Sequence, residues 1–309
     1  MHRREILRVA SAAIGGAALL SGPATVAARP TSAKPAARRV GPYVETADGA
    51  QLYVRDWGRG PTLLFLGGWT LPSDIWGYQM TPLAEAGFRC IGYDRRGHGR
   101  SSDPGRGYDY DSLADDLAAV LEALDLRDVV VVAHSMAGGE AVRCASRRGA
   151  GRIARIVFIG TTLPFLTKTV DNPDGLDPAV FEQSRQSVFS KGFPTVLQAN
   201  LRPFLTPETS DAMVEWVRTL MLQCSLKAAI DCNKALTATD FRAELRGLKT
   251  PALFIHGDRD VSAPAPLSAA KAAQLLPHAT VKIYEGAPHG LMLTHAARLN
   301  RDLMEFARG

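Results

Sequence analysis

The stretch that most constrains the fold is residues 129–139, which read VVVVAHSMAGG. Four consecutive valines predict a short strand buried on both faces, and residues 140–145 have the pattern of a helix. Ser135 therefore stands at a junction between a strand and a helix. A tight turn at such a junction, usually G-x-S-x-G, holds the serine hydroxyl above the end of a sheet. Because Ala133 and Ala137 replace both glycines, the prediction depends on the strand and the helix on either side.

The charge distribution argues against nucleic acid as a partner. The chain has 309 residues, 46% hydrophobic and 22% charged, and its net charge is +5. This length allows one large domain or two small ones. Residues 1–40 contain seven Lys or Arg but only one acidic residue, so the remainder is close to neutral. Because no basic stripe with interleaved aromatic residues is present, we expect no nucleic-acid binding.

Residues 1–28 resemble a bacterial twin-arginine (Tat) export signal. Arg3 and Arg4 precede an apolar run over residues 9–20 that is too short to span a bilayer comfortably. Small residues at 25–28 suit a cleavage site. We expect residues 29–41 to be a flexible linker, and the protein to be periplasmic or extracellular without stable membrane insertion after cleavage. The alternatives are an uncleaved membrane anchor and a basic tail.

Strand and helix patterns alternate through residues 42–309, which we expect to form one domain. This alternation predicts an α/β fold with a mostly parallel sheet and helices on both faces. Strands are expected at 43–46, 51–57, 62–66, 88–93, 129–132, 153–159, 251–256 and 280–284. Helices are expected at 75–86, 110–124 and 291–306, besides the one after Ser135. The two strands at 43–46 and 51–57 flank Asp48-Gly49 and read as a hairpin.

The alternation stops between residues 161 and 245, where no strand is evident. Helical patterns lie around 179–190, 194–201, 208–223 and 225–236, so we expect a helical cap above the carboxyl edge of the sheet. Phe165, Phe204 and Trp216 are candidates to line a substrate pocket there, together with Phe181 and Met221. We expect only one or two of these side chains to touch substrate, because most would form the core of the cap itself.

The cysteines predict no metal site. Cys90 and Cys144 fall in expected core elements and read as inert. Cys224 and Cys232 are close in sequence, and export would permit a disulfide between them. On one straight helix, however, they would lie about 12 Å apart, too far to bond, so their state stays open. Because no spacing resembles that of a zinc site, we expect neither a metal nor a cofactor.

A nucleophilic serine needs a histidine as general base and an acid that orients the histidine. In a parallel sheet all three should follow the carboxyl ends of strands. The loop after strand 251–256 supplies Asp258 and Asp260, and the loop after strand 280–284 supplies His289. The order Ser135, Asp, His289 is the one expected for an exposed serine of this kind. The other histidines are expected to be structural (His98, His134, His256) or on the surface (His278, His295).

Five segments spread over residues 42–308 form a recognisable set: GW at 68–69, DRRGHGRS at 94–101, HSMAGGE at 134–140, HGDRD at 256–260 and GAPHG at 286–290. With these segments, residues 42–308 resemble the cofactor-free bacterial haloperoxidase (perhydrolase/arylesterase) branch of the α/β-hydrolases. The resemblance implies Asp260 as the triad acid, with Asp258 as the fallback. It also implies an oxyanion hole made by the backbone N–H groups of Trp69 and Met136. The chain departs from this branch at Gly67-Gly68, where His-Gly is usual, and at the two alanines beside Ser135.

These residues predict a serine hydrolase that cleaves carboxylic esters of small molecules through an acyl-enzyme. Hydrogen peroxide in place of water would give a peracid, a side activity that the resemblance permits. A lactonase, an amidase or a carbon–carbon bond hydrolase would use the same triad. A non-catalytic ligand-binding protein is the alternative from another class. A dehalogenase is disfavoured because its nucleophile is Asp, and the oligomeric state stays open.

Overall fold

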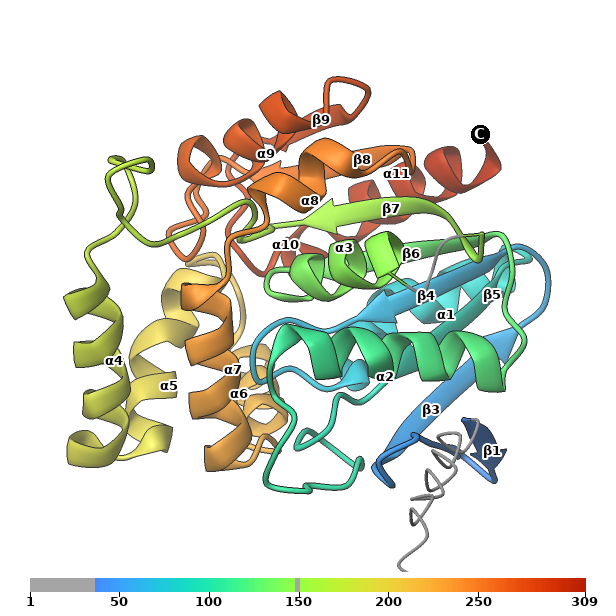
Figure 1. Ribbon diagram of the computed structural model, residues 1–309, viewed down its shortest axis with the longest axis horizontal. Helices are drawn as coiled ribbons and strands as arrows, with labels where there is room; N and C mark the ends of the chain where they lie inside the picture. Colours follow the sequence, from blue (N-terminus) through green and yellow to red (C-terminus); the bar gives the residue numbers. More distant parts are fainter. Residues whose placement is uncertain (1–36, 148–150) are drawn as a thin grey trace, which may run out of the picture. The chain divides into compact units, whose positions relative to one another are not determined.

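The computed structural model describes residues 37–147 and 151–309, so the expected export signal and most of the expected linker lie outside it. The described residues contain a nine-stranded sheet in the order β1-β2-β3-β5-β4-β6-β7-β8-β9 (Figure 1). The first three strands pair antiparallel, β3 pairs antiparallel with β5, and all later neighbours are parallel. The strands are β1 Arg38–Val40, β2 Tyr43–Glu45, β3 Gln51–Gly58, β4 Thr62–Leu66, β5 Arg89–Tyr93, β6 Val129–His134, β7 Ile153–Ile159, β8 Ala252–Gly257 and β9 Thr280–Tyr284.

Alternate residues of the central strands pack into two separate cores, one on each face of the sheet. In β6, Val129 and Val131 belong to one core while Val130 and Val132 belong to the other. Strand side chains alternate between faces, so a strand covered on both sides must be apolar throughout. Helices α2, α3, α8 and α9 contribute to the first core, and α1 and α11 contribute to the second. The predicted α/β fold with helices on both faces is therefore confirmed.

The flanking helices carry local signals that set their ends. Asp109 caps α2, because its side chain accepts a hydrogen bond from the Ser112 amide. Gly87 follows α1 with a φ of +87°, a conformation that suits glycine. These helices are η1 Ser73–Trp76, α1 Gly77–Glu85, α2 Tyr110–Ala123, α3 Ala137–Arg147, α8 Arg242–Gly247, η2 Ala265–Leu267, α9 Ala269–Leu275, α10 Leu291–Thr294 and α11 Ala296–Arg308.

Four further helices follow β7 and gather beyond the end of the sheet to which the β7 arrow points (Figure 1). They are α4 Pro178–Lys191, α5 Phe193–Phe204, α6 Asp211–Met221 and α7 Leu226–Ala238. We call them the cap helices. The backbone N–H of Gly99 donates to Gln223 O, and that of Ser225 donates to Gly97 O. These two bonds tie the segment between α6 and α7 to the loop that follows β5.

Three local expectations differ from the structure. Residues 38–40 of the expected linker form β1, because Gly41 (φ +60°) turns the chain and Arg38 pairs with Glu45 on β2. The expected final helix over 291–306 is interrupted at His295, whose φ of −125° is not helical. Finally, the residues just before 245 belong to α8, which packs with α3 and α9.

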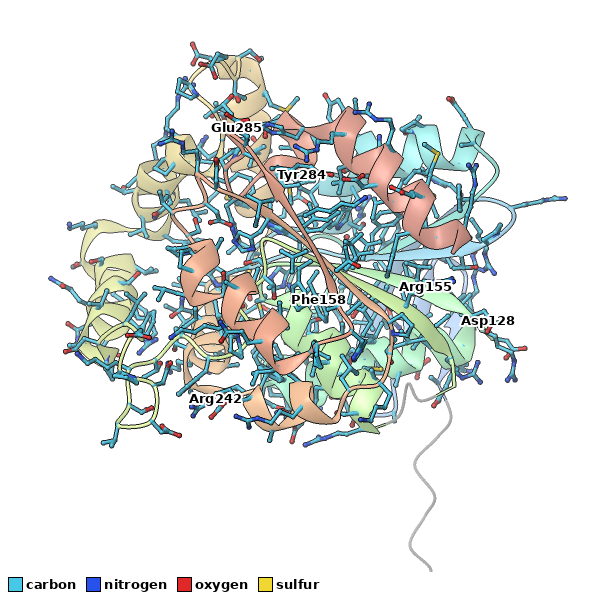
Figure 2. The ribbon with its side chains drawn as sticks, turned by 90° about the horizontal axis from the view of Figure 1, so that it is seen from above. Asp128, Arg155, Phe158, Arg242, Tyr284 and Glu285 are labelled. Atoms are coloured by element: carbon cyan, nitrogen blue, oxygen red, sulfur yellow. The ribbon has the colours of Figure 1, made fainter. Side chains whose placement is uncertain are left out.

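Figure 2 shows the layers from above, with Phe158 of β7 in the interior and Asp128, in the turn before β6, at the periphery. Phe158 stacks on Phe254 of β8 with ring centroids 4.8 Å apart. All four cysteines are buried, and Cys224 and Cys232 are separate thiols, which answers the open question of a disulfide between them. None of the described helices is long and apolar enough to cross a membrane.

Candidate active site

Ser135 occupies a strained turn between β6 and α3. Its φ is +57°, a region that side-chain-bearing residues adopt rarely. The turn is fixed by the Ser135 N–H, which donates to Ile159 O on β7 at 2.9 Å, and by the Gly138 N–H, which donates to Ser135 O at 3.1 Å. The valines of β6 anchor the strand in both cores, so the turn presents the serine side chain at the carboxyl edge of the sheet.

The loop after β4 passes directly against this turn. A Cβ atom built on Gly68 would lie 2.5 Å from Nδ1 of His134 and 3.1 Å from Cβ of Ser135. Only glycine fits such a close approach without displacing a neighbour. The close contact between the loop after β4 and the turn at Ser135 therefore requires glycine at Gly68. This requirement does not depend on which residue replaces the usual histidine at Gly67.

The structure brings Ser135 and His289 together. Nε2 of His289 lies 2.9 Å from Oγ of Ser135, and both side chains are buried. His289 lies in the loop after β9, whose end is marked by Tyr284 and Glu285 in Figure 2. The Gly290 N–H donates to Phe204 O at 2.8 Å, which fixes the loop against the end of α5.

Asp260 is the third side chain in this hydrogen-bonded series, after Ser135 and His289. Its Oδ2 lies 2.7 Å from Nδ1 of His289, and its Oδ1 accepts from the amides of Ser262 and Ala263 at 2.9 and 2.8 Å. Burial alone would raise the pKa of Asp260, but its charge interaction with His289 and its hydrogen bonds to His256 and His289 hold that pKa below its usual range. The carboxylate therefore stays ionised and holds the His289 proton on Nδ1.

Asp258, the fallback acid, points elsewhere. It is exposed, and its Oδ1 accepts from the Gly286 amide at 2.8 Å. Among the two carboxylates of this loop that sequence alone left open, Asp260 is the one placed at His289.

His134 supports the site without contacting Ser135 Oγ through a hydrogen bond. Its Nε2 lies 3.1 Å from the carbonyl oxygen of His289, and its ring packs edge-on against Trp76 and Phe204. Burial and the neighbouring His289 hold the pKa of His134 well below its ordinary value, so the ring stays neutral. His256 and His98 are also buried and bond to the backbone oxygens of Ala263 and Arg96.

The Trp69 and Met136 N–H groups are the expected oxyanion donors. Neither N–H donates a hydrogen bond to any residue within 37–147 or 151–309. In a trans peptide group the N–H and C=O point in opposite directions. The carbonyl paired with the Met136 N–H is that of Ser135, which accepts from Gly138. The carbonyl paired with the Trp69 N–H is that of Gly68, which accepts from the Arg95 guanidinium at 3.1 Å and from the Leu71 N–H at 3.2 Å.

A cavity of about 260 Å³ lies above these groups, between the sheet edge and the cap helices. Ser135, His134, His289 and Trp69 line it from the core side, together with Leu71. The cap contributes both apolar and polar side chains: Phe181, Ser184, Leu197, Asn200, Phe204, Met221, Asn233, Leu236 and Thr237. Volumes of this order suit small-molecule ligands.

Two of the five pocket candidates lie outside this cavity. Phe181, Phe204 and Met221 line it, whereas Phe165 and Trp216 do not. Trp216 instead packs edge-on against Tyr78 of α1, with ring centroids 6.1 Å apart. Phe165 lies beneath the guanidinium of Arg242, which Figure 2 places in the outer part of the molecule. Trp216 on its helix and Phe165 in its loop therefore lie away from the cavity. Their positions could not be deduced without knowing how the cap helices are arranged.

Sequence reasoning missed two groups at this site. It singled out the segment 94–101 without giving Arg95 a role, although Arg95 donates to the carbonyls of Gly67 and Gly68, next to Trp69. It also missed Asn233 on α7, because only the packing of α4 on α7 reveals that this residue lines the cavity. No cluster of three or more His, Cys, Asp or Glu in the described part of the chain could hold a metal ion.

Comparison with known proteins decides the family. The profile of the family described as alpha/beta hydrolase fold matches residues 61–296. This chain is an α/β-hydrolase. It is 40% identical over 271 residues to a non-heme haloperoxidase of Rhodococcus erythropolis, covering 86% of this chain and 98% of that protein. It is 35% identical over 274 residues to a bifunctional esterase/perhydrolase of Acinetobacter calcoaceticus, covering 86% and 99% of the two chains.

Solved structures place the α/β-hydrolase in the same branch. The bromoperoxidase of Bacillus anthracis superposes with a TM-score of 0.81 at 36% identity, covering 84% of this chain and 96% of that one. An esterase of Exiguobacterium antarcticum superposes with a TM-score of 0.84 at 26% identity, covering 87% and 100%. The resemblance to the non-heme haloperoxidase branch, expected from the motifs, is therefore confirmed.

Proposed function

We propose that this α/β-hydrolase cleaves carboxylic esters of small molecules through an acyl-enzyme on Ser135. The proposal depends on two successive hydrogen bonds, from Ser135 Oγ to His289 Nε2 (2.9 Å) and from His289 Nδ1 to Asp260 Oδ2 (2.7 Å). Ser135 and His289 line the cavity together with Trp69. Relatives with esterase and perhydrolase activity in their names support this assignment.

The steps follow from the geometry. Ser135 Oγ attacks the ester carbonyl carbon while His289 Nε2 accepts the hydroxyl proton, and Asp260 stabilises the imidazolium. The carbonyl oxygen gains negative charge and accepts hydrogen bonds from the Trp69 and Met136 amides, a contribution of about 3 kcal/mol per donor. His289 then returns its proton to the leaving alcohol. Water, deprotonated by His289, releases the carboxylic acid and restores Ser135.

Perhydrolysis would use the same intermediate. Hydrogen peroxide replaces water, its oxygen bonds to the acyl carbon, and the products are a peracid and free Ser135. This activity is proposed from the printed names of the haloperoxidase and perhydrolase relatives. It needs no electron transfer on the protein, because the peroxide O–O bond survives in the peracid.

The test of the assignment is the mass of the intact protein after treatment with a fluorophosphonate. An activated Ser135 forms an Oγ–P bond with loss of fluoride, so the native protein should gain one adduct. Ser135→Ala should gain none and should lose turnover of short aryl esters by at least 1,000-fold. A folded native protein that takes up no adduct, or a Ser135→Ala variant with native turnover, would refute the proposal.

We also propose that residues 1–28 direct export by a twin-arginine route, since Arg3 and Arg4 precede an apolar run with small residues after it. The test replaces both arginines with lysine in the full chain. The native chain should appear in the exported fraction, shortened by about 28 residues by mass spectrometry, whereas the variant should stay full-length inside the cell. Equal export of both chains would contradict the proposal.

A further inference from the structure

The guanidinium of Arg95 binds the loop after β4, which carries the Trp69 N–H, one of the two proposed oxyanion donors. Arg95 follows β5 and is almost fully buried, with 4% of its surface exposed. Its Nη2 donates to Gly67 O at 2.6 Å, and its Nη1 donates to Gly68 O at 3.1 Å. Two consecutive backbone carbonyls are therefore held by one rigid fork of donors.

The Arg95 contact sets the direction of the Trp69 amide together with the Leu71 N–H, which donates to the same Gly68 carbonyl at 3.2 Å. The Gly68 carbonyl and the Trp69 N–H belong to one planar peptide group, in which they point in opposite directions. Because Arg95 binds the carbonyl from the interior, the N–H is turned toward the other side, where Ser135 lies against Gly68. Rotating this peptide group would break the bond to a buried cation, which is costly in a low-dielectric interior.

Glu140 joins this arrangement to the second donor. Arg95 Nε donates to Glu140 Oε1 at 2.7 Å, and the Glu140 side chain is 1% exposed. Glu140 lies in the first turn of α3, four positions after Met136 and directly behind the turn at Ser135. One buried ion pair thus connects the loop of the Trp69 amide to the helix of the Met136 amide.

We propose that Arg95, held by Glu140, is a positioning residue that sets the spacing and direction of the two oxyanion donors. The inference depends on the proposed ester hydrolysis and deepens it. Arg95 does not itself line the cavity and makes no hydrogen bond to Ser135 in the described part of the chain, so it acts through the Gly68–Trp69 peptide. Lysine could not replace it, because an ammonium group cannot hold Glu140 and both carbonyls in one plane.

The chain offers a matched control for the loss of a buried ion pair. Arg96, the next residue, pairs with Asp116 through Nε and Nη2, and both side chains are at most 2% exposed. Arg96 also bonds to Asp48, but it donates to no atom of the Trp69 loop. A loss of activity caused by removing any buried ion pair should therefore appear whether the Arg95–Glu140 pair or the Arg96–Asp116 pair is removed. A loss caused by displaced oxyanion donors should appear only when the Arg95–Glu140 pair is removed.

The experiment compares Arg95→Met/Glu140→Leu with Arg96→Met/Asp116→Leu. Apolar residues of similar volume remove both charges of each buried pair. The control also removes the Arg96 partner of Asp48, but that carboxylate is 41% exposed and stays solvated. Each protein is assayed with an aryl ester and with the thiono analogue, in which sulfur replaces the carbonyl oxygen. Sulfur is larger and accepts hydrogen bonds weakly, so the oxo-to-thiono ratio of kcat/KM reports how well the two amides fit an oxyanion.

For the Arg95/Glu140 variant we expect kcat on the oxo ester to fall roughly 10- to 1,000-fold. KM should change less than about 3-fold, because the cavity lining is untouched, and the oxo-to-thiono ratio should fall at least about 10-fold. The Arg96/Asp116 variant should keep the native ratio. A folded Arg95/Glu140 variant with a native ratio, or an equal fall in the control variant, would overturn the proposal.

A second variant keeps the test decisive if the double variant fails to fold. Arg95→Lys retains the charge beside Glu140 but loses at least one carbonyl contact, so its ratio should lie between the native and double-variant values. A native ratio in folded Arg95→Lys would also overturn the proposal. Failure of ester hydrolysis itself is distinguishable, because it would appear as native turnover in Ser135→Ala.

Discussion

The Oδ2 atom of Asp260 lies 2.7 Å from Nδ1 of His289, while Oδ1 of the same carboxylate is held by two backbone amides. The amides fix the plane of the carboxylate, and the carboxylate in turn fixes the tautomer and the direction of the imidazole. His289 therefore presents an unprotonated Nε2 to the Ser135 hydroxyl at 2.9 Å. This relationship makes the first prediction specific to one of the two aspartates in the loop.

Asp260→Asn should lower kcat on short aryl esters by roughly 1,000- to 10,000-fold, because an amide group facing Nδ1 favours the wrong imidazole tautomer. Asp258→Asn is the matched control and should stay within about 2-fold of native turnover, since its retained Oδ1 still accepts from the Gly286 amide. Steady-state kinetics measures both. Asp260→Asn turnover above a tenth of the native value would exclude Asp260 as the orienting acid.

Gly68→Ala should damage both activity and stability. The new methyl group would stand 2.5 Å from His134 Nδ1, and the His134 ring has no room because Trp76, Phe204 and His289 surround it. We expect turnover to fall at least about 10-fold and the free energy of unfolding to fall by about 1–3 kcal/mol, as in overpacked cores.

Gly77→Ala is the control for this substitution. Gly77 begins α1 with a helical φ of −53°, and its added Cβ would have no neighbour within 4 Å. Alanine at such a position should leave turnover native and stabilise the protein by up to about 1 kcal/mol. Urea unfolding of both variants tests the pair, and equal destabilisation would contradict the role given to the contact at Gly68.

The central sheet and the triad positions could be predicted because both follow from short-range signals. The four valines of β6 must be buried on both faces, and the loops after β6, β8 and β9 must meet at one edge. The arrangement of the cap could not be predicted in this way. Trp216 and Phe204 both lie on amphipathic cap helices, and only the packing of those helices decides that Trp216 meets Tyr78 while Phe204 meets His289.

Two further features, β1 and the role of Arg95, could not be predicted because each depends on contacts with residues elsewhere in the chain. β1 has only three residues and is held by pairing with β2, so composition alone marked it as linker. Arg95 reads as one more charged residue of a polar loop until the carbonyls of Gly67 and Gly68 are placed beside it. A buried cation with a paired carboxylate is therefore a signal that appears only in three dimensions.

His98 should make the protein less stable as pH falls below neutrality. Burial lowers the pKa of His98 to about 3, whereas in the unfolded chain an ordinary histidine titrates near 6.5. The unfolded state thus binds the proton first, so stability is lost as pH falls from about 6.5 toward 3. Between pH 7 and pH 5 the loss attributable to His98 is about 2 kcal/mol.

His98→Asn should reduce the slope of stability against pH over this range by that amount. The measurement is the free energy of unfolding in urea at pH 7 and at pH 5 for both proteins, which separates the slope from any uniform loss of stability. His134 shifts in the same direction and should leave a residual slope in the variant. Identical slopes in the two proteins would show that His98 is not held neutral by the fold.

Phe204→Leu should alter substrate preference, whereas Trp216→Leu should not. The Phe204 ring packs edge-on against His289 with centroids 5.8 Å apart and lines the cavity, so a smaller side chain widens the space beside the base. We expect kcat/KM for acetyl esters to fall at least about 5-fold and the optimum to move toward longer acyl chains. An acyl-length series tests both variants, and equal shifts would place the specificity determinant elsewhere.

Asn233 should favour substrates with a hydrogen-bond acceptor in the part that reaches the cap. Arg185 Nη1 donates to Asn233 Oδ1 at 3.0 Å, so the carboxamide oxygen faces Arg185. The Nδ2 group then has no hydrogen-bond partner among residues 37–147 and 151–309, and Asn233 lines the cavity. Once a ligand displaces water from the cavity, such a donor stays paired only when the ligand supplies an acceptor.

Native enzyme should therefore prefer an ester with a distal ether or ketone oxygen over its alkyl isostere, and Asn233→Leu should lower that preference roughly 10-fold. Lys234→Leu is the control, because Lys234 is the next residue on α7 but is exposed and absent from the cavity lining. The measurement is the ratio of kcat/KM for the two esters. The assignment fails if Asn233→Leu keeps the native ratio, because the carboxamide would then not contact the substrate during turnover.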